Sequence, residues 1–369
     1  MTEALDTHRC WAEIDRAALR HNAQVARKCV GPDVALLAVI KANAYGHGLA
    51  AVADALRDDA QLFGVANVQE AIAARTAVPH PVMILGPALP TERAAIIEHG
   101  FIPSISSYDE AVAFSSLAEE RRVHINCKID TGMGRMGIGE TSAAAEIARI
   151  AKLPHIEIHS VSSHLPAADE DAEYTATQLE RFNALIERIR RDVPGSYQVH
   201  TLPSAGVLRF ANSTHTIVRA GLMIYGISPI PEQQDLLRPA LTLKAHVALL
   251  RDVEAGTSIS YGRTFIASQR MRVATLGIGY ADGFPRSVSN RGAAVLIGGR
   301  RCAVLGRVTM DLIVVDVSEV PNVKVGDEAV LIGRQGEEEI LATEVAERAS
   351  TIAWEIFTGI GSRVARVYV

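Results

Sequence analysis

The sequence has no long hydrophobic run, no closely spaced cysteines and no excess of positive charge. Its longest notable apolar run, residues 34–40, is far shorter than the roughly 18–20 residues that cross a bilayer. Residues 1–11 contain no apolar segment of the kind found in a secretory signal. The 4 cysteines are scattered and form no CxxC pair, which argues against a zinc ribbon and a disulfide framework. These absences predict a cytoplasmic protein that does not enter a membrane.

The composition excludes two further classes of protein. With 42 acidic and 37 basic residues the formal net charge is −5, whereas binding along a nucleic-acid backbone requires a surplus of cations. Hydrophobic residues make up 48% and charged residues 21% of the chain, which is ordinary for a globular protein and unlike a disordered one. The length of 369 residues predicts about two domains.

Short apolar runs alternate with helical patterns over the first two thirds of the chain. One helical example is 176–193, where apolar residues recur on a single face. The alternation predicts a parallel sheet, and the number of runs favours a closed (β/α)8 barrel of the TIM type over an open sheet. The runs are 35–40, 62–67, 82–86, 101–105, 123–129, 156–163, 197–202 and 216–226.

The pattern changes at residues 229–239, which are rich in proline and polar residues and are predicted to be a linker. Beyond this segment, apolar runs follow one another closely with turn residues between them, which is typical of a mainly-β domain. We therefore expect a barrel over 12–236 and a C-terminal β domain over 237–369. Residues 1–11 are a candidate addition to the second domain, and the segment CWAEID is a candidate extra strand of it.

The first candidate for chemistry is AVIKANAYGHG, residues 38–48. A buried-looking strand ends there in Lys41, and the active site of a barrel lies at the C-terminal ends of its strands. Desolvation at such a place lowers the pKa of a lysine and makes its amine available for a Schiff base. An isolated lysine at a strand end is more commonly just solvated.

The second candidate is KIDTGMGRMG, residues 128–137, which holds a GxGxxG pattern after an apolar run. This pattern occurs in dinucleotide-binding turns, where phosphate lies at a helix N-terminus. Here, however, the pattern falls in the fifth strand unit and carries two cations, Lys128 and Arg135. A glycine-rich turn that presents Arg135 to a carboxylate fits these residues better, since a guanidinium binds a carboxylate bidentately.

Three further features are weak when taken singly. His164 and Arg219 stand at the ends of predicted strands, and SISYGRTF (258–265) places Tyr261 on a turn. A strand-end histidine is often a satisfied polar residue, and a single tyrosine most often belongs to the core or its rim. The segment GRVTMD, residues 306–311, is otherwise a plain strand and turn.

Taken together and in this order, these segments resemble the alanine racemases, a family of enzymes that use pyridoxal 5′-phosphate (PLP). AVIKANAYGHG is highly specific for the family, and KIDTGMGRMG, VRAGLMIYG, SYGRTF, GYADGFPR and GRVTMD follow it in the family's order. The resemblance covers nearly the whole chain. It implies an α/β protein with an N-terminal (β/α)8 barrel and a C-terminal mainly-β domain, which interconverts L-alanine and D-alanine and supplies D-alanine for peptidoglycan.

The resemblance implies a mechanism with two bases on opposite faces of the substrate Cα. Lys41 would hold PLP covalently and act on D-alanine, and Tyr261 would act on L-alanine. A free tyrosine has a pKa of about 10, too high for a good base at neutral pH. The family's solution is a hydrogen-bond chain, here from Tyr261 through His164 to Arg219. Arg219 would also face the pyridine nitrogen of PLP, where its charge disfavours protonation of the ring and limits transamination.

The resemblance also assigns binding roles. Lys128 matches a lysine that the family carries as a carbamate, which orients Arg135, and the entrance residues would be Tyr280, Arg286, Arg307 and Asp311. A head-to-tail homodimer is implied, with Tyr261 reaching the partner's active site. The implied PLP-binding residues, besides Lys41 and Arg219, are Tyr45, Ser204, Gly221, Leu222 and Trp354. The implied substrate-binding groups are Arg135, Lys128 and the backbone N–H of Met310.

The chain departs from the family pattern at three positions. Trp354 stands where tyrosine is usual, Pro203 where asparagine is usual and Thr309 where cysteine is frequent. Trp354 leaves room for a changed substrate, so a racemase of serine or of a broad range of amino acids is one alternative. A PLP-binding protein that does not racemise is another, although the β domain with Tyr261 argues against it. A nucleotide-dependent oxidoreductase is a distant third.

Overall fold

The computed structural model describes residues 8–211 and 215–369, which form two compact units. The barrel unit comprises 19–44 and 49–238, and the C-terminal unit comprises the described residues up to Ala18 together with 45–48 and 239–369. The division after Arg238 lies two residues beyond the end expected for the barrel. Residues 12–18, which were expected in the barrel, belong to the C-terminal unit.

The barrel unit contains a sheet whose path runs through eight parallel strands in its described residues. Each of the eight apolar runs overlaps one of them, so the predicted strands and barrel are confirmed. Arg219 N donates to Leu202 O (2.9 Å) and Thr216 N to Val199 O (3.0 Å), which brings the first and last strands of the path together. The path is β10 (Ile217–Ala220), β2 (Ala35–Val39), β3 (Leu62–Val65), β4 (Val82–Ile84), β5 (Ile102–Ile105), β6 (Val123–Asp130), β8 (Ile156–Ser162) and β9 (Gln198–His200).

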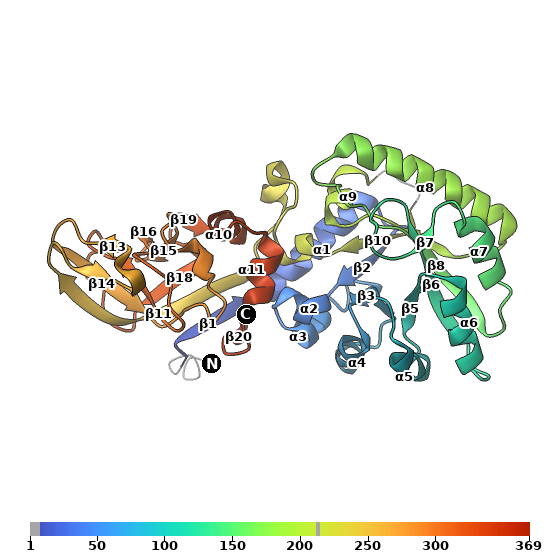
Figure 1. Cartoon of the computed structure of the whole chain (residues 1–369), viewed down its shortest axis with the longest axis horizontal. Coiled ribbons are helices and arrows are strands. Elements are labelled where there is room, and N and C mark those ends of the chain that lie inside the picture. The colour runs from blue at the N-terminus through green and yellow to red at the C-terminus, as the bar shows by residue number, and fades with distance from the viewer. Residues whose placement is uncertain (1–7, 212–214) are drawn as a thin grey trace. The chain divides into compact units, whose positions relative to one another are not determined.

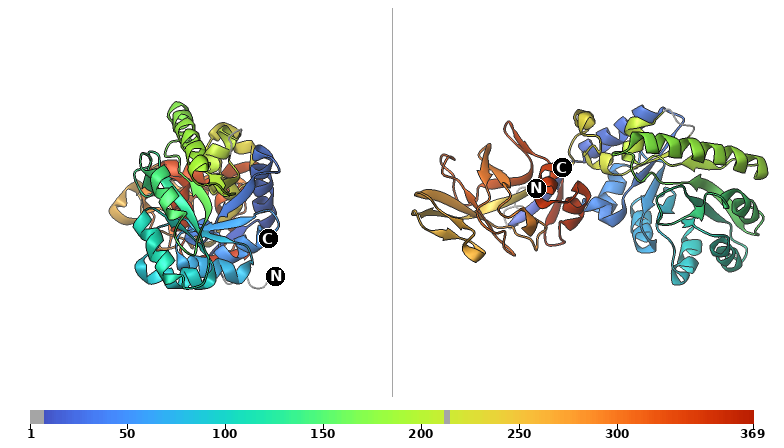
Figure 2. Two further views of the ribbon diagram at one scale, coloured as in Figure 1. Left: turned by 90° about the vertical axis from the view of Figure 1, so that its right-hand side faces the viewer. Right: turned by 45° about the horizontal axis from the view of Figure 1, so that its top comes forward.

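Helices pack outside these strands, as Figure 1 and Figure 2 show for α4 to α8. Side-chain caps start several of them, because the first backbone N–H groups of a helix lack partners. Ser107 Oγ, for example, accepts from Glu110 N at the start of α6. The helices are α1 (Arg16–Val30), α3 (Leu49–Ala55), α4 (Val68–Ala77), α5 (Arg93–His99), α6 (Tyr108–Leu117), α7 (Ala143–Ile150), α8 (Ala172–Asp192) and α9 (Ser204–Arg209).

The predicted linker is an ordered segment that contains the short 3-10 helix η3 (Pro231–Leu236). The Gln234 side chain donates to Gly226 O (2.9 Å) and accepts from Ser228 N (2.9 Å). The Asn22 side chain accepts from Arg238 N (2.8 Å) and so fixes the end of the barrel unit.

The C-terminal unit is mainly β, as predicted. Its central strand is the long β11 (Leu241–Val253), and β1 (Cys10–Ile14), from the segment CWAEID, pairs with it. The main sheet runs in the order β16 (Arg300–Ala303), β15 (Ala294–Ile297), β18 (Glu328–Gln335), β11, β1 and β20 (Ala365–Tyr368). The remaining elements are β14 (Met271–Leu276), β17 (Ile313–Asp316), β19 (Glu338–Ile340), the hairpin of β12 (Ser258–Ile259) and β13 (Phe265–Ile266), α10 (Ala342–Ala349) and α11 (Ala353–Gly359).

A search of the described residues for a helix long and apolar enough to cross a membrane finds none.

Candidate active site

Lys41 begins a left-handed helical turn directly after β2. In this turn, α2 (Lys41–Tyr45), the residues Ala42, Asn43 and Ala44 each have a φ of 53°. The left-handed conformation costs a non-glycine residue about 1–2 kcal/mol, so the surrounding structure must hold it. Asn43 Oδ1 accepts from Leu49 N (2.9 Å) and Ala44 N donates to Ile40 O (2.8 Å). Such stored strain is characteristic of functional sites.

Glu70, near the start of α4, bonds the strained turn and also acts on the pKa of Lys41. Its Oε1 accepts from Asn43 N (3.2 Å) and its Oε2 from Ala66 N (2.9 Å). Burial and the charge of Arg135 lower the pKa of the Lys41 amine, and Glu70 opposes them. The net effect is a lowered pKa, which shifts the Lys41 amine toward its neutral form, the nucleophilic and basic one.

Arg219, on β10, is the centre of a buried hydrogen-bond network. Its Nη1 contacts His200 Nδ1 (2.6 Å) and donates to His200 O (3.0 Å), and its Nη2 contacts His164 Nδ1 (3.1 Å). Nη2 also donates to two carbonyls, Ser163 O (2.8 Å) and Thr201 O (2.9 Å). All five of these contacts are made by the two terminal nitrogens of the guanidinium.

Burial controls the charge in this network. It lowers the pKa of Arg219 to about 10, so the guanidinium remains charged at neutral pH. Burial, followed by the charge of Arg219, holds the pKa of His164 and of His200 well below the ordinary histidine range. A single cation therefore lies between two neutral imidazoles.

In the glycine-rich turn of 128–137, backbone N–H groups donate to the side-chain carboxylate of Asp130 in the same turn. Asp130 Oδ1 accepts from the backbone N–H of Gly132 (3.0 Å), Met133 (2.9 Å) and Gly134 (3.1 Å). The amides that a nucleotide phosphate would need are thus already bonded, which argues against the dinucleotide interpretation. The closed turn presents Arg135, whose charge contributes to the lowered pKa of Lys41 and of His164.

Lys128 lies on β6 among cations. Burial, then the charges of Arg219 and Arg135, hold its pKa well below the usual lysine value, while Asp130 acts in the opposite direction. The structure therefore favours a neutral Lys128 amine in the interior of the barrel unit.

The Ser204 hydroxyl is held in place by two backbone N–H groups that follow β10. Pro203 precedes α9, and the hydroxyl of Ser204 accepts from Gly221 N (3.0 Å) and Met223 N (3.3 Å). Because both N–H groups donate to its oxygen, the Ser204 hydroxyl keeps its own proton to donate to a further acceptor, such as a phosphate oxygen. Ser204, Gly221 and Leu222 are thus brought together by the fold.

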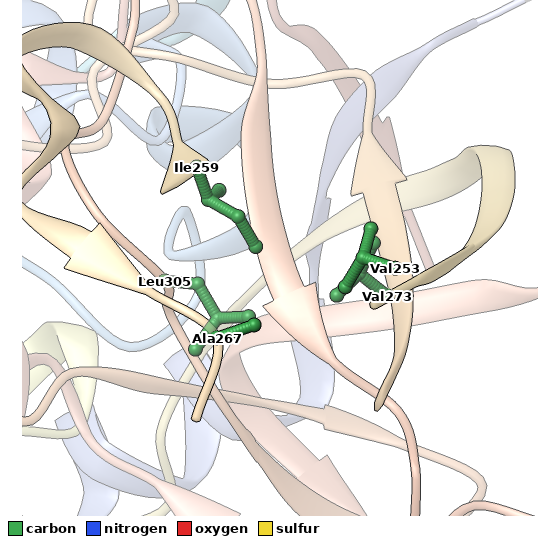
Figure 3. Close-up of a cluster of buried hydrophobic side chains, with 5 residues drawn as sticks. All are labelled: Val253, Ile259, Ala267, Val273 and Leu305. Carbon is green, nitrogen blue, oxygen red and sulfur yellow. The ribbon is translucent and has the colours of Figure 1, made fainter. Parts of the chain in front are cut away.

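Tyr261 lies in the C-terminal unit, on the turn between β12 and β13, and is 71% exposed. Ser260 Oγ donates to Arg307 O (2.5 Å), and a Cβ at Gly262 would lie 2.8 Å from the Arg307 guanidinium. A cluster of buried hydrophobic side chains, shown in Figure 3, includes Ile259 of β12 and Ala267, which flank this turn in the sequence. Its buried members are Val253, Ile259, Ala267, Val273 and Leu305.

The other expected residues of the C-terminal unit differ in burial. Burial raises the pKa of Tyr45 to about 12, so its phenol stays protonated and can donate a hydrogen bond. Met310 is 53% exposed and Trp354, on α11, is half-buried. The expected site residues therefore form two groups. The barrel unit holds Lys41, Lys128, Arg135, His164, Ser204, Arg219, Gly221 and Leu222, and the C-terminal unit holds Tyr45, Tyr261, Met310 and Trp354.

The sequence interpretation missed three residues of the candidate site. His200 is the last residue of β9, within the run 197–202, so its strand-end position was a usable signal. Asp130 directly precedes the residues T-G-M-G. An aspartate before a glycine-rich turn typically accepts hydrogen bonds from the backbone N–H groups of that turn. Glu70 follows Asn67 at capping distance, but nothing in the sequence links it to Asn43.

Comparison with known proteins shows that the chain has relatives of similar length. Residues 14–229 match the family model "Alanine racemase, N-terminal domain" and residues 240–368 match "Alanine racemase, C-terminal domain". An alanine racemase of Halothermothrix orenii is 38% identical, over 98% of this chain and 97% of the relative. The solved alanine racemase of Clostridium difficile 630 superimposes with a TM-score of 0.93 at 32% identity, over 98% of this chain and 96% of that one. The solved alanine racemase of Bacillus anthracis with bound L-Ala-P gives 0.90 at 34% identity, over 98% and 95%.

Proposed function

The chain belongs to the alanine racemase family, and we propose that its two groups of site residues act from opposite sides of one substrate carbon. The activity is the interconversion of L-alanine and D-alanine, an isomerisation. The observation that carries the mechanism is the buried network in which Arg219 joins His164 and His200 beside Lys41. The cofactor that the family implies is PLP.

The barrel residues fit this cofactor. The Ser204 hydroxyl, which accepts from Gly221 N and Met223 N and keeps its own proton to donate, would bind the phosphate. The Arg219 guanidinium, held by the carbonyl of Ser163 among others, would face the ring nitrogen. The Lys41 amine, with its lowered pKa, is suited to the covalent bond. When bound, PLP withdraws electrons from the substrate Cα and makes its proton acidic.

Two residues then move that proton. The Lys41 amine removes or returns it on the D face, and the Tyr261 phenol does so on the L face. His164 accepts from Arg219 at Nδ1, so its own proton is on Nε2 and can stabilise the oxygen of Tyr261. The guanidinium of Arg219 disfavours a proton on the ring nitrogen of the cofactor, which limits transamination.

Arg135 and the N–H of Met310 hold the substrate carboxylate in this proposal. A cation near Lys41 needs a counterion, and Lys128 can supply one as a carbamate. The neutral Lys128 amine that burial favours is the form that adds CO2, with release of a proton, and the product is an anion. A mass increase equal to CO2 on the peptide that contains Lys128 tests this modification.

A second copy of the chain completes each site. The loops that carry Tyr261, Tyr280 and Met310 expose large apolar side chains, at 71%, 40% and 53%. Tyr280 N donates to Thr309 O (3.0 Å), so two of these loops are joined. Exposed apolar groups in neighbouring loops are suited to a protein interface. We infer a head-to-tail homodimer, located in the cytoplasm, that supplies D-alanine for peptidoglycan.

The proposal is tested with the purified protein and PLP. Incubation with L-alanine is followed by chiral chromatography, and L-serine and longer L-amino acids are compared in parallel. Fast formation of D-alanine with little D-serine supports the proposal. An excess of D-serine would instead identify serine as the preferred substrate and leave the two-base mechanism in place. Borohydride reduction followed by peptide mapping should place PLP on Lys41, and the Lys41→Ala variant should bind none covalently.

A further inference from the structure

A continuous line of buried polar side chains runs through the interior of the barrel unit and ends at Arg219. Each link joins residues on neighbouring strands, and every side chain in it is at most 6% exposed. From Arg219 the line passes to His200 (2.6 Å), Ser160 (3.3 Å), Asn126 (3.0 Å), Ser104 (3.0 Å) and the carbonyl of Ile84 (2.7 Å).

Strand register creates this line. Ser104 on β5 is the direct partner of Asn126 on β6, and Asn126 is the direct partner of Ser160 on β8. The three side chains therefore form one polar layer across three strands. Most interior positions of a barrel of this type are filled by branched apolar residues, so a connected polar layer requires every member to be satisfied.

Only one arrangement of protons satisfies the whole line. A guanidinium can only donate, so Nδ1 of His200 accepts from Arg219 and the imidazole proton is on Nε2. This proton is donated to Ser160 Oγ, and the Ser160 hydroxyl donates to Asn126 Oδ1.

The far end fixes the remaining two protons. The amide of Asn126 donates to Ser104 Oγ, and the Ser104 hydroxyl donates to Ile84 O, which can only accept. The opposite orientation of the Asn126 amide would take the Ser104 proton away from the Ile84 carbonyl. Both ends thus specify the same direction, and each proton points away from Arg219.

We propose that Ser160, Asn126 and Ser104 are positioning residues that lock His200 in its Nε2–H tautomer and thereby hold Arg219 in its working orientation. Without an acceptor at Ser160, His200 can carry its proton on Nδ1. Two N–H groups would then face each other, because Nδ1 lies 2.6 Å from Nη1 of Arg219. Arg219 would then turn away from His164 and from the position beside the cofactor ring that the proposed function gives it. The inference rests on the proposed function in one respect, the role of Arg219.

The tautomer is measured directly on the full-length holoenzyme labelled with ¹⁵N-histidine. The resonances of His200 are assigned by their loss in His200→Gln, and the ¹⁵N shifts then report which nitrogen carries the proton. The wild type should show only Nε2–H. Ser160→Ala should show a mixture of tautomers, and Ser160→Thr, which retains the hydroxyl, should restore the single form.

Kinetics provide a second readout. We expect Ser160→Ala to lower kcat roughly tenfold, as the loss of a buried hydrogen bond allows, with little change in the KM for alanine. Pyruvate formed per D-alanine should rise as Arg219 loosens. Ser104→Ala breaks the last link and should act in the same direction but more weakly, which provides a test if Ser160→Ala does not fold.

The control is Ser115→Ala, which removes another buried hydroxyl, 7% exposed at the residue, that bonds Pro154 O (2.7 Å) outside the line. It should leave the tautomer and the pyruvate ratio unchanged. A wild-type His200 with its proton on Nδ1, or a Ser160→Ala enzyme that matches the control in every readout, would overturn the inference. A wild type that fails to racemise alanine would instead reject the proposed function, while the tautomer measurement would still decide the inference.

Discussion

Nη2 of Arg219 lies 3.1 Å from Nδ1 of His164, and the same guanidinium reaches His200 on its other side through Nη1. One side chain therefore donates to the Nδ1 atoms of two histidines. Burial and the charge of Arg219 keep both imidazoles neutral. This fork geometry cannot be reproduced by a lysine, which carries a single compact ammonium group.

Arg219→Lys should therefore lower the rate of racemisation by about 100-fold or more and raise the share of transamination. The ammonium cannot bond two imidazoles and three carbonyls together. D-alanine and pyruvate should be measured in the same reaction. Arg209→Lys is the matched control, since Arg209 also bonds backbone carbonyls of the barrel unit, at Ala168 and Asp169. A normal rate and pyruvate ratio in Arg219→Lys would contradict the role given to the guanidinium.

The sequence predicts the strands well because each buried parallel strand is a continuous apolar run. The strand-end pattern makes Lys41 and Arg219 candidates, because strand ends meet at one face of a barrel, and the family resemblance supplies the roles proposed for them. The sequence does not predict the left-handed turn at Ala42 to Ala44, since alanine has no preference for a positive φ. The line from Ser104 to Ser160 depends on register between strands distant in sequence, which single-strand patterns do not encode.

Mixing two inactive variants tests the composite site. Lys41→Ala and Tyr261→Ala chains should each be inactive, and subunit exchange should form some dimers with one intact site. Random exchange of equal amounts restores one intact site to about half of the dimers, by the symmetry of a two-fold assembly. Activity should be followed during mixing, with each variant alone as the control. Exchange without recovery would show that Tyr261 acts within its own chain or not at all.

Asp130→Ala should raise the KM for alanine several-fold with a smaller effect on kcat. The carboxylate accepts from three amides of the turn that presents Arg135, and without it the turn loses its shape. Asp130→Asn keeps the Oδ1 acceptor and should stay close to the wild type. Steady-state kinetics of the two variants provide the measurement. Equal losses in both, or an unchanged KM in Asp130→Ala, would argue that the turn does not serve the substrate.

Trp354→Tyr should widen the choice of substrate. The resemblance to the family places Trp354 at the entrance of the pocket, and indole is larger than phenol. An added hydroxyl or methylene is discriminated by only about 1–3 kcal/mol, so a small gain in space should be measurable. The ratio of kcat/KM for L-alanine to that for L-serine should fall several-fold. An unchanged ratio would mean that Trp354 does not limit the pocket.

The stability of the barrel unit should fall as the pH is lowered below neutral. Burial, then the charge of Arg219, lower the pKa of His215 to about 4, whereas a histidine in the unfolded chain titrates near 6.5. Between these values the unfolded chain binds a proton that the folded chain does not. The free energy of unfolding therefore decreases as the pH falls, by about 1.4 kcal/mol per pH unit for each such histidine.

His215→Gln removes this titrating group, so the free energy of unfolding should depend less steeply on pH. Urea unfolding at pH 5, 6, 7 and 8 should be followed by far-UV circular dichroism, because both tryptophans, Trp11 and Trp354, belong to the C-terminal unit. The variant also loses the contact of His215 with Thr201 (2.6 Å), so its stability at pH 8 should be lower while its slope is smaller. His21→Gln, at a half-buried histidine of the barrel unit that contacts Leu236 O, is the control for the loss of a histidine. An unchanged slope in His215→Gln would mean that His215 does not stay neutral in the folded protein.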